Sequence, residues 1–184
     1  MEKKILIHTC CGPCAIIPIK MLEGEFEPIG FWFNPNIHPY KEYQKRLQTA
    51  GYVFKRLNRE IFWDISYDIF SWFSLIIEEI KNGRDRCEKC YAIRLEKTAQ
   101  FAKQNGFKYF TTSMLVSPYQ KTSSIERIGK ETGEKYSLIF ISRDFKSHYK
   151  EEKVFIKQWQ LYHQNYCGCL FSEIERLGIV NEKI

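Results

Sequence analysis

Three of the seven cysteines lie in one short loop near the start of the chain: Cys10, Cys11 and Cys14. An apolar run, residues 5–7, precedes this loop, and a helix-like segment, residues 15–22, follows it. A strand, a loop and a helix in this order place reactive side chains at the carboxyl end of a parallel sheet. Gly12 allows a tight turn, and Pro13 suits the first turn of a helix, whose N-terminus favours a thiolate. We therefore expect the catalytic centre to form at this loop.

The other four cysteines form two closely spaced pairs far along the chain: Cys87 with Cys90, and Cys167 with Cys169. We expect both pairs to return to the first cysteine loop in the folded protein. The N-terminus leads into a short strand and not into a long apolar signal region, which favours the cytoplasm. Cysteines rarely form a structural disulfide framework in that reducing compartment, so the spacing indicates metal or redox chemistry.

Strand-like and helix-like segments alternate along the chain, which predicts an α/β fold with a doubly wound, mostly parallel sheet. The predicted strands are residues 4–9, 28–33, 52–57, 109–113 and 137–141, of which 52–57 carries the weakest pattern. The predicted helices are residues 15–23, 40–50, 65–81, 87–104, 122–130, a segment after Phe145 that ends near His163, and 172–177. A length of 184 residues suits one domain over residues 1–184, with a helical C-terminal region.

Loops with distinctive residues follow four of the predicted strands, at residues 10–14, 34–39, 113–120 and 143–144. The carboxyl ends of parallel strands share one edge of a sheet, so these loops are expected to line one crevice. Three side chains near that edge are candidate general acids: His8, Tyr119 and Asp144. Tyr119 is also a candidate for stacking on a nucleic-acid base.

Four cysteines could supply thiolates to one metal centre: Cys10, Cys11, Cys87 and Cys90. Structural zinc is usually held by two C-x-x-C pairs, and the adjacent pair fits that pattern poorly because neighbouring side chains point apart. An iron–sulfur cluster spreads its ligands more widely, so we expect a cluster and keep structural zinc as the alternative. Arg84, Arg86 and Lys89 flank the second pair and are expected to stabilise its thiolates. Cys14 either binds a further metal or only packs.

Two of the cysteine motifs also allow redox chemistry. Residues 11–14 match the Cys-Gly-Pro-Cys loop of thioredoxin-like proteins, although that interpretation leaves Cys10 and four other cysteines unexplained. Cys167 and Cys169 could close only a very small, strained disulfide ring. A strained disulfide is easily reduced, which suits a redox-active pair better than a structural bridge, with extra metal ligands as the alternative.

The net charge of +6 is compatible with an ordinary basic protein and with a polyanionic partner such as RNA. Ten basic residues are expected to be solvated on loops or polar helix faces: Lys41, Lys45, Arg46, Lys55, Arg56, Lys121, Arg127, Lys146, Lys150 and Lys153. Four aromatic residues are expected in the core: Trp63, Phe70, Trp72 and Phe73. No apolar run reaches the roughly 18 residues that a membrane span needs, so no membrane association is expected.

The motifs together resemble the cobalamin-independent epoxyqueuosine reductases, the QueH family. The resemblance rests on residues 8–14, 34–43, 86–95, 117–120, 144–145 and 166–169, in this order over nearly the whole chain. It implies a fold like that of the adenine-nucleotide α-hydrolases (HUP-like), with a cysteine loop in place of the ATP phosphate loop. A sulfur transferase of a related fold would need a Ser-Gly-Gly type of phosphate loop, and the sequence has none.

The resemblance also implies a reaction, cofactors and partners. The reaction would be the last step of queuosine synthesis, in which the epoxide of epoxyqueuosine at position 34 of tRNA becomes an alkene. Cys10, Cys11, Cys87 and Cys90 would bind a [4Fe–4S] cluster, and Cys167 and Cys169 would be the redox-active pair. An additional iron is expected near the cluster, cobalamin is not, and an electron donor must regenerate the enzyme. The remaining alternative is a non-catalytic, zinc-bound RNA-binding module.

Overall fold

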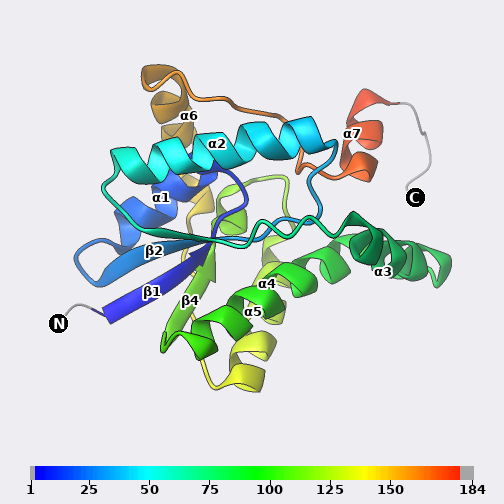
Figure 1. The fold of residues 1–184 in the computed structure, drawn as a ribbon, viewed down its shortest axis with the longest axis horizontal. Helices are drawn as coiled ribbons and strands as arrows, with labels where there is room; N and C mark the ends of the chain where they lie inside the picture. Colours follow the sequence, from blue (N-terminus) through cyan, green and yellow to red (C-terminus); the bar gives the residue numbers. More distant parts are fainter. Residues whose placement is uncertain (1–2, 179–184) are drawn as a thin grey trace.

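In the computed structural model, which describes residues 3–178, five strands form one parallel sheet with helices packed on both faces (Figure 1). The strands are β1 (Lys3–His8), β2 (Phe26–Trp32), β3 (Ile61–Trp63), β4 (Tyr109–Thr112) and β5 (Ile139–Phe140). The α-helices are α1 (Gly12–Leu22), α2 (Tyr40–Arg56), α3 (Ile69–Lys81), α4 (Arg86–Gln104), α5 (Thr122–Tyr136), α6 (Tyr149–Gln158) and α7 (Leu170–Leu177), with short 3-10 turns η1 (Ser113–Val116) and η2 (Lys146–His148). The predicted α/β class with a doubly wound parallel sheet is confirmed.

The strand order is β3-β2-β1-β4-β5, so the chain reverses its direction of travel across the sheet between β1 and β4. Both neighbours pair with β1 in parallel, with Ile7 opposite Gly30 on one side and opposite Thr111 on the other. Ligands of open α/β sheets bind at such a reversal point, outside the carboxyl ends of the strands. The cysteine loop follows β1 and the η1 turn follows β4, so both lie at this position.

The core forms where β1 is covered on both faces. Ile5, Leu6 and Ile7 are fully buried, which explains why this strand is a continuous apolar run without alternation. Pro18 lies inside α1, and the helix continues through it because its apolar side chains pack into the core. None of the helices within residues 3–178 has the length and apolarity to cross a bilayer.

The prediction of a strand over residues 52–57 was wrong, because α2 continues through Gly51 to Arg56. Val53 and Phe54 are fully buried, and their burial outweighs the cost of about 1 kcal/mol that a glycine imposes on a helix. The third strand is instead β3, a three-residue segment that was not predicted. Its pairing with residues 30–32 of β2 defines it, and so short a run has no periodicity of its own.

Several predicted helix boundaries also shift. α5 extends beyond residue 130 to Tyr136 because Gly129 and Gly133 let the helix approach the strand that follows it. A Cβ at residue 129 would lie 2.5 Å from the Phe140 ring, and one at residue 133 would lie 2.9 Å from a backbone oxygen. α3 begins only at Ile69, because the Asp68 side chain accepts a hydrogen bond from Ser71 N at 3.0 Å and caps the helix there.

Replacing the glycines of the packed helices α1 and α2 by alanine should change the free energy of unfolding in opposite directions at Gly12 and Gly51. A Cβ on Gly12 would lie 2.7 Å from the backbone oxygen of Thr49, so Gly12→Ala must push α2 away and should destabilise by about 1–3 kcal/mol. A Cβ on Gly51 would lie 3.8 Å from the Trp63 ring, an ordinary contact. Gly51→Ala should therefore stabilise by about 1 kcal/mol through helix propensity. Urea unfolding measures the free energy of unfolding of both variants. Equal changes in that free energy would contradict the close contact between α1 and α2.

The expected aromatic core is only partly observed. Trp72 is buried, as predicted, and Phe73 is partly buried. Phe70 is 82% exposed and Trp63 is 42% exposed, so the prediction of core positions for these two was wrong. α3 packs on α4 with one face only and projects beyond the sheet (Figure 1), which leaves Phe70 facing solvent.

Candidate active site

The first cysteine loop brings three sulfur atoms together at the carboxyl end of β1. The sulfurs of Cys10, Cys11 and Cys14 all lie within 4.8 Å of one another, a spacing at which they could hold a metal ion. Cys11 is the N-cap of α1, and its sulfur accepts a hydrogen bond from Cys14 N at 3.3 Å. Cys11 and Cys14 are joined by a disulfide in this structure. Cys11 must therefore be reduced before its sulfur can bind metal.

Cys10 is held from the neighbouring strand of the sheet. Its backbone N–H donates to Ser113 Oγ at 3.0 Å, and the Ser113 hydroxyl lies 3.2 Å from the Cys10 sulfur. Ser113 follows β4 directly, so this contact spans the point where the strand order reverses. The hydrogen bonds fix the cysteine loop against the segment that follows β4.

The second cysteine pair lies in the first turns of α4, where Asp85 caps the helix by accepting from Cys87 N at 2.8 Å. Cys90 is buried and belongs to one apolar cluster with Trp72 and Ile76 of α3. Cys169 belongs to the same cluster, and Cys167 packs against it. The second and third cysteine motifs therefore share one packed environment, which the chain assembles from segments about 80 residues apart.

The third pair lies immediately before α7, with the sulfurs of Cys167 and Cys169 at 3.5 Å from each other. Cys169 is the N-cap of α7 and accepts from Ser172 N at 3.3 Å, while Cys167 N donates to Ser172 Oγ at 3.2 Å. Each of the three cysteine motifs thus lies at the N-terminus of a helix, where backbone N–H groups and the helix dipole favour negative charge. In Figure 1, α3 and α7 lie beyond the carboxyl end of β1.

Arg94 links the three motifs electrostatically. Its side chain is buried in α4, one turn after Cys90, and Nε donates to the Cys90 carbonyl at 3.2 Å. Burial raises the pKa of Cys10, Cys90 and Cys167, and the charge of the guanidinium acts in the opposite direction on all three. A buried cation among thiols is the complement of an anionic metal–thiolate centre, so this donor set fits a thiolate-bound cluster.

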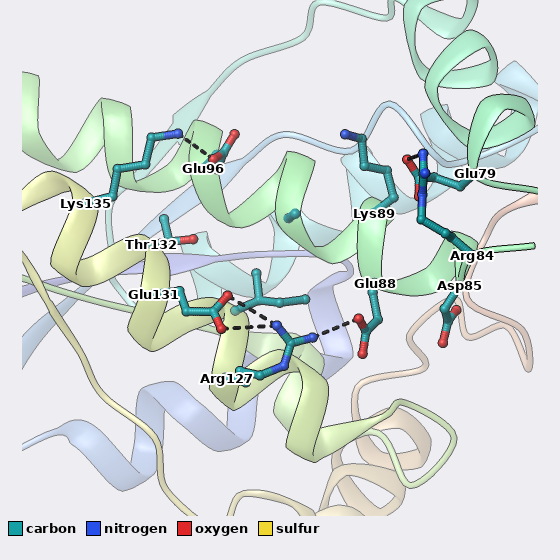
Figure 2. Close-up of a pocket in the computed structure, with 12 residues that line it drawn as sticks. Glu79, Arg84, Asp85, Glu88, Lys89, Glu96, Arg127, Glu131, Thr132 and Lys135 are labelled. Atoms are coloured by element: carbon teal, nitrogen blue, oxygen red, sulfur yellow. Dashed lines mark hydrogen bonds and ion pairs between the residues drawn. The ribbon is translucent and has the colours of Figure 1, made fainter. Parts of the chain in front are cut away.

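Of the three basic residues expected to stabilise the second pair, one does so. Arg86 lowers the pKa of Cys87, while burial raises that pKa to about 11. Arg84 is paired with Glu79 at 2.5 Å. Figure 2 shows Lys89 in a charged groove between α4 and α5, where Arg127 bridges Glu88 and Glu131. The predicted role was therefore wrong for Arg84 and Lys89, and Arg94, from the next turn, takes their place.

The cysteines fall into two classes by protonation. Burial raises the pKa of Cys10, Cys87 and Cys90, so these thiols hold their protons at neutral pH until a metal displaces them. In the Cys167–Cys169 pair, the hydrogen bond between the sulfurs lowers the pKa of Cys167 to about 5 and raises that of Cys169. One thiolate and one thiol side by side are the reactive form of a dithiol.

His8, one predicted acid, is fully buried at the end of β1 with both ring nitrogens in contact with protein. Nε2 donates to the Phe33 carbonyl at 3.1 Å, so Nδ1, 3.0 Å from Thr112 Oγ1, is the acceptor. Burial and the charge of Arg94 lower its pKa to about 3. This neutral imidazole connects the ends of β1, β2 and β4, and it carries no proton that it could release readily at neutral pH.

The other two predicted acids are exposed. Asp144 accepts a hydrogen bond from Ser147 N at 3.1 Å and so supports the η2 turn after β5. Tyr119 is 78% exposed, with its ring 6.4 Å from that of Tyr149 in an edge-to-face contact. Both residues are therefore accessible to solvent, and their role as acids stays a prediction.

The structure adds a buried acid that the sequence did not reveal. Glu152 of α6 is 1% exposed, and neither carboxylate oxygen has a hydrogen-bond partner among the described residues. Burial raises its pKa to about 7, and its charge in turn raises the pKa of Cys10. A carboxyl group that is half-protonated at neutral pH is suited to proton transfer. In the sequence Glu152 lies in a charged helical run, which gives no sign of its burial.

Arg46 also departs from expectation. It was predicted to be a solvated charge, but its side chain is 2% exposed and contacts the loop that carries Cys167. Other basic positions, including Lys41, Lys45 and Arg56, are exposed as predicted. The burial of Arg46 follows from a partner on the same helix, Glu42, whose carboxylate lies 2.6 Å from its Nε.

Comparison with known proteins gives one consistent result. The family model described as "Epoxyqueuosine reductase QueH" matches residues 5–175. Similar curated proteins of that name include one from Thermotoga maritima, 35% identical over 94% of this chain and 91% of its own length. Others come from Dehalococcoides mccartyi, at 33% identity over 98% of both chains, and from Streptococcus pyogenes, at 31% over all of this chain and 76% of its own.

Proposed function

The chain belongs to the epoxyqueuosine reductase QueH family and is an oxidoreductase, and we propose that it reduces epoxyqueuosine to queuosine at position 34 of tRNA. The observation that carries this proposal is the family match over residues 5–175, and the electrostatic interaction of the buried Arg94 with Cys10, Cys90 and Cys167, one cysteine of each motif, supports it. The substrate would place the enzyme in the cytoplasm, with tRNA as its partner.

The reaction defines what the site must supply. Both bonds from carbon to the epoxide oxygen break, a carbon–carbon double bond forms, and the oxygen leaves as water. This change consumes two electrons and two protons. Cys167 and Cys169 supply the two electrons and one of the protons when a thiolate and a thiol become one disulfide, and their sulfurs lie 3.5 Å apart in this structure. The second proton comes from a general acid. An external electron donor must then reduce the disulfide before the next turnover.

Cys10, Cys11, Cys87 and Cys90 would hold the [4Fe–4S] cluster, with Cys11 released from its disulfide. When bound, such a cluster would transfer single electrons. Cys14, within 4.8 Å of two of these sulfurs, would be available to an additional iron once it is reduced. No cobalamin is required in this proposal. Arg94 offsets the negative charge of the thiolates from inside the protein.

The epoxide oxygen needs a proton as it leaves. Tyr119 and Asp144 can reach substrate from exposed loops, and Glu152 holds a proton in the interior near Cys10. His8 contributes by position, since it fixes the ends of three strands beneath the cysteine loop. Nucleotides of an anticodon loop are single-stranded, so the modified base can leave the stack and enter the crevice.

The proposal is tested by anaerobic incubation of the protein with a strong reductant and tRNA that contains epoxyqueuosine. We expect the modified nucleoside to lose one oxygen, measured by mass spectrometry after digestion of the tRNA. The assay needs no added cobalamin. Iron-loaded protein that binds the tRNA and forms no product would contradict the proposed reaction. A colourless protein that holds only zinc would instead favour the RNA-binding alternative.

A further inference from the structure

A buried arginine donates hydrogen bonds to the backbone at the redox-active pair. Arg46 of α2 is 2% exposed, and its guanidinium donates from Nη1 to the Cys167 carbonyl at 3.0 Å. Nη2 donates to the Tyr166 carbonyl at 3.3 Å, and the group also lies over the Tyr166 ring. The planar fork of an arginine can hold two neighbouring carbonyls at once, which an ammonium group cannot do.

The guanidinium is itself held in place. Glu42, one turn earlier in α2, accepts from Arg46 Nε at 2.6 Å through one carboxylate oxygen. The other oxygen accepts from the Tyr162 hydroxyl. Both charged groups are therefore buried with their partners, and the side chain of Arg46 has one orientation. Breaking a buried ion pair of this kind from one side is costly.

Gly168 lies against the same guanidinium, next to the carbonyl that Nη1 binds. Its φ of +108° is a conformation that side chains disfavour, and a Cβ there would lie 3.0 Å from Arg46 Nη1 and from Ile37. His38 N donates to the Gly168 carbonyl at 2.7 Å. The Cys-Gly-Cys backbone is thus fixed between α2 and the loop that follows β2.

We propose that Arg46 is a positioning residue for the Cys167–Cys169 pair: its two-point contact with the backbone holds the sulfurs at the separation from which the disulfide closes. The inference rests on the proposed function in that this pair acts as the dithiol. In that step the S–H bond of Cys169 breaks and its sulfur forms the S–S bond with the Cys167 thiolate. The pair gives two electrons to the epoxide, Cys169 gives one proton, and a general acid gives the second, so that the oxygen leaves as water.

This role predicts the direction of change when Arg46 is lost. A looser backbone lowers the effective concentration of one thiol at the other, which disfavours the disulfide. For Arg46→Gln we expect the dithiol–disulfide equilibrium constant against glutathione to fall about tenfold, which is about 30 mV for this couple. Arg46→Lys keeps the charge but can bind only one of the two carbonyls at a time. Its equilibrium constant should therefore lie between those of Arg46→Gln and the wild type.

The equilibrium can be read without assaying turnover. Trypsin should release residues 158–176 as one peptide, whose only cysteines are Cys167 and Cys169, so alkylation and mass spectrometry report the oxidised fraction. Arg56→Gln is the matched control, because it makes the same change on an exposed face of α2 and should leave the constant unchanged. A folded Arg46→Gln protein with the wild-type constant, or full recovery by Arg46→Lys, would overturn the proposal.

Two further variants cover the case in which Arg46→Gln does not fold. Replacing Arg46 and Glu42 together by methionine removes both buried charges, a change that proteins often tolerate. Gly168→Ala instead places a Cβ 3.0 Å from Nη1, the nitrogen that donates to the Cys167 carbonyl, and so disturbs the same contact from the loop. Both should also lower the equilibrium constant, and a wild-type value in both would refute the role. A wild type that does not reduce the tRNA would refute the proposed function, while the shift caused by Arg46→Gln would still support the positioning role.

Discussion

Replacing Cys90 by alanine is expected to remove the iron of anaerobically purified protein, together with its broad absorption near roughly 400 nm. Cys90 is buried against Trp72 and Ile76, so water cannot readily replace the lost thiolate at that position. Turnover should fall by more than about 100-fold, beyond the loss caused by residues that only support a metal ligand. The visible spectrum and analysis of iron and sulfide measure the first effect, and the tRNA assay measures the second.

The same helix offers the control. Lys89 lies between the two cysteines in sequence, but its side chain lines the groove shown in Figure 2. Lys89→Ala should therefore retain iron, colour and turnover. A Cys90→Ala protein that keeps a full complement of iron and sulfide would contradict the assignment of this cysteine as a ligand.

Replacing Cys169 by alanine should have a different effect, with the iron kept and turnover slowed. The variant cannot form the disulfide, so turnover should slow by about tenfold or more, equivalent to about 1.4 kcal/mol in barrier height. Cys167→Ala should behave alike, because the two thiols act as one unit. Iron analysis and the tRNA assay separate this outcome from that of Cys90→Ala. Full activity in both variants would contradict a redox role for the pair.

The pair also predicts a pH dependence. Cys169 lowers the pKa of Cys167 to about 5, so the thiolate is present above that pH and is lost as the pH falls through it. Alkylation of Cys167 in the wild type should be nearly independent of pH between about 6 and 8. In Cys169→Ala the hydrogen bond is gone, and the pKa should return toward the ordinary value of about 8.5. Alkylation at pH about 6 should then slow strongly, as peptide mapping can measure.

The sequence predicted the fold best where the residue types and the hydrophobic periodicity indicate the same strand or helix. The apolar run before the cysteine loop predicted β1, and the Gly-Pro step predicted the start of α1, because each signal is local to a few residues. The alternation of strand-like and helix-like segments along the chain then predicted the parallel sheet. The prediction failed over residues 52–57, where a glycine suggested an end to α2 and burial of Val53 and Phe54 continued the helix.

The cysteine motifs could be found from spacing alone, and membership in the family follows from their order. Their surroundings could not be predicted in that way. Arg46 and Glu152 each look like an ordinary charge on a polar helix, yet both are buried. Arg94 lies within the motif of residues 86–95, but its interaction with a cysteine of each motif depends on how α4 packs. The sequence alone does not indicate which charged side chains become buried in the folded protein.

Local patterns of residues thus predicted the candidate residues for the chemistry and the edge of the sheet at which they lie. Which charged side chains face the thiols and which face solvent became visible only in the packed fold. The physical reason is the range of the contacts: Arg46 reaches the Cys167 carbonyl across 121 residues, and Ser113 reaches Cys10 across 103. Such hydrogen bonds form only after the sheet and its helices have packed, so no local pattern of residues records them.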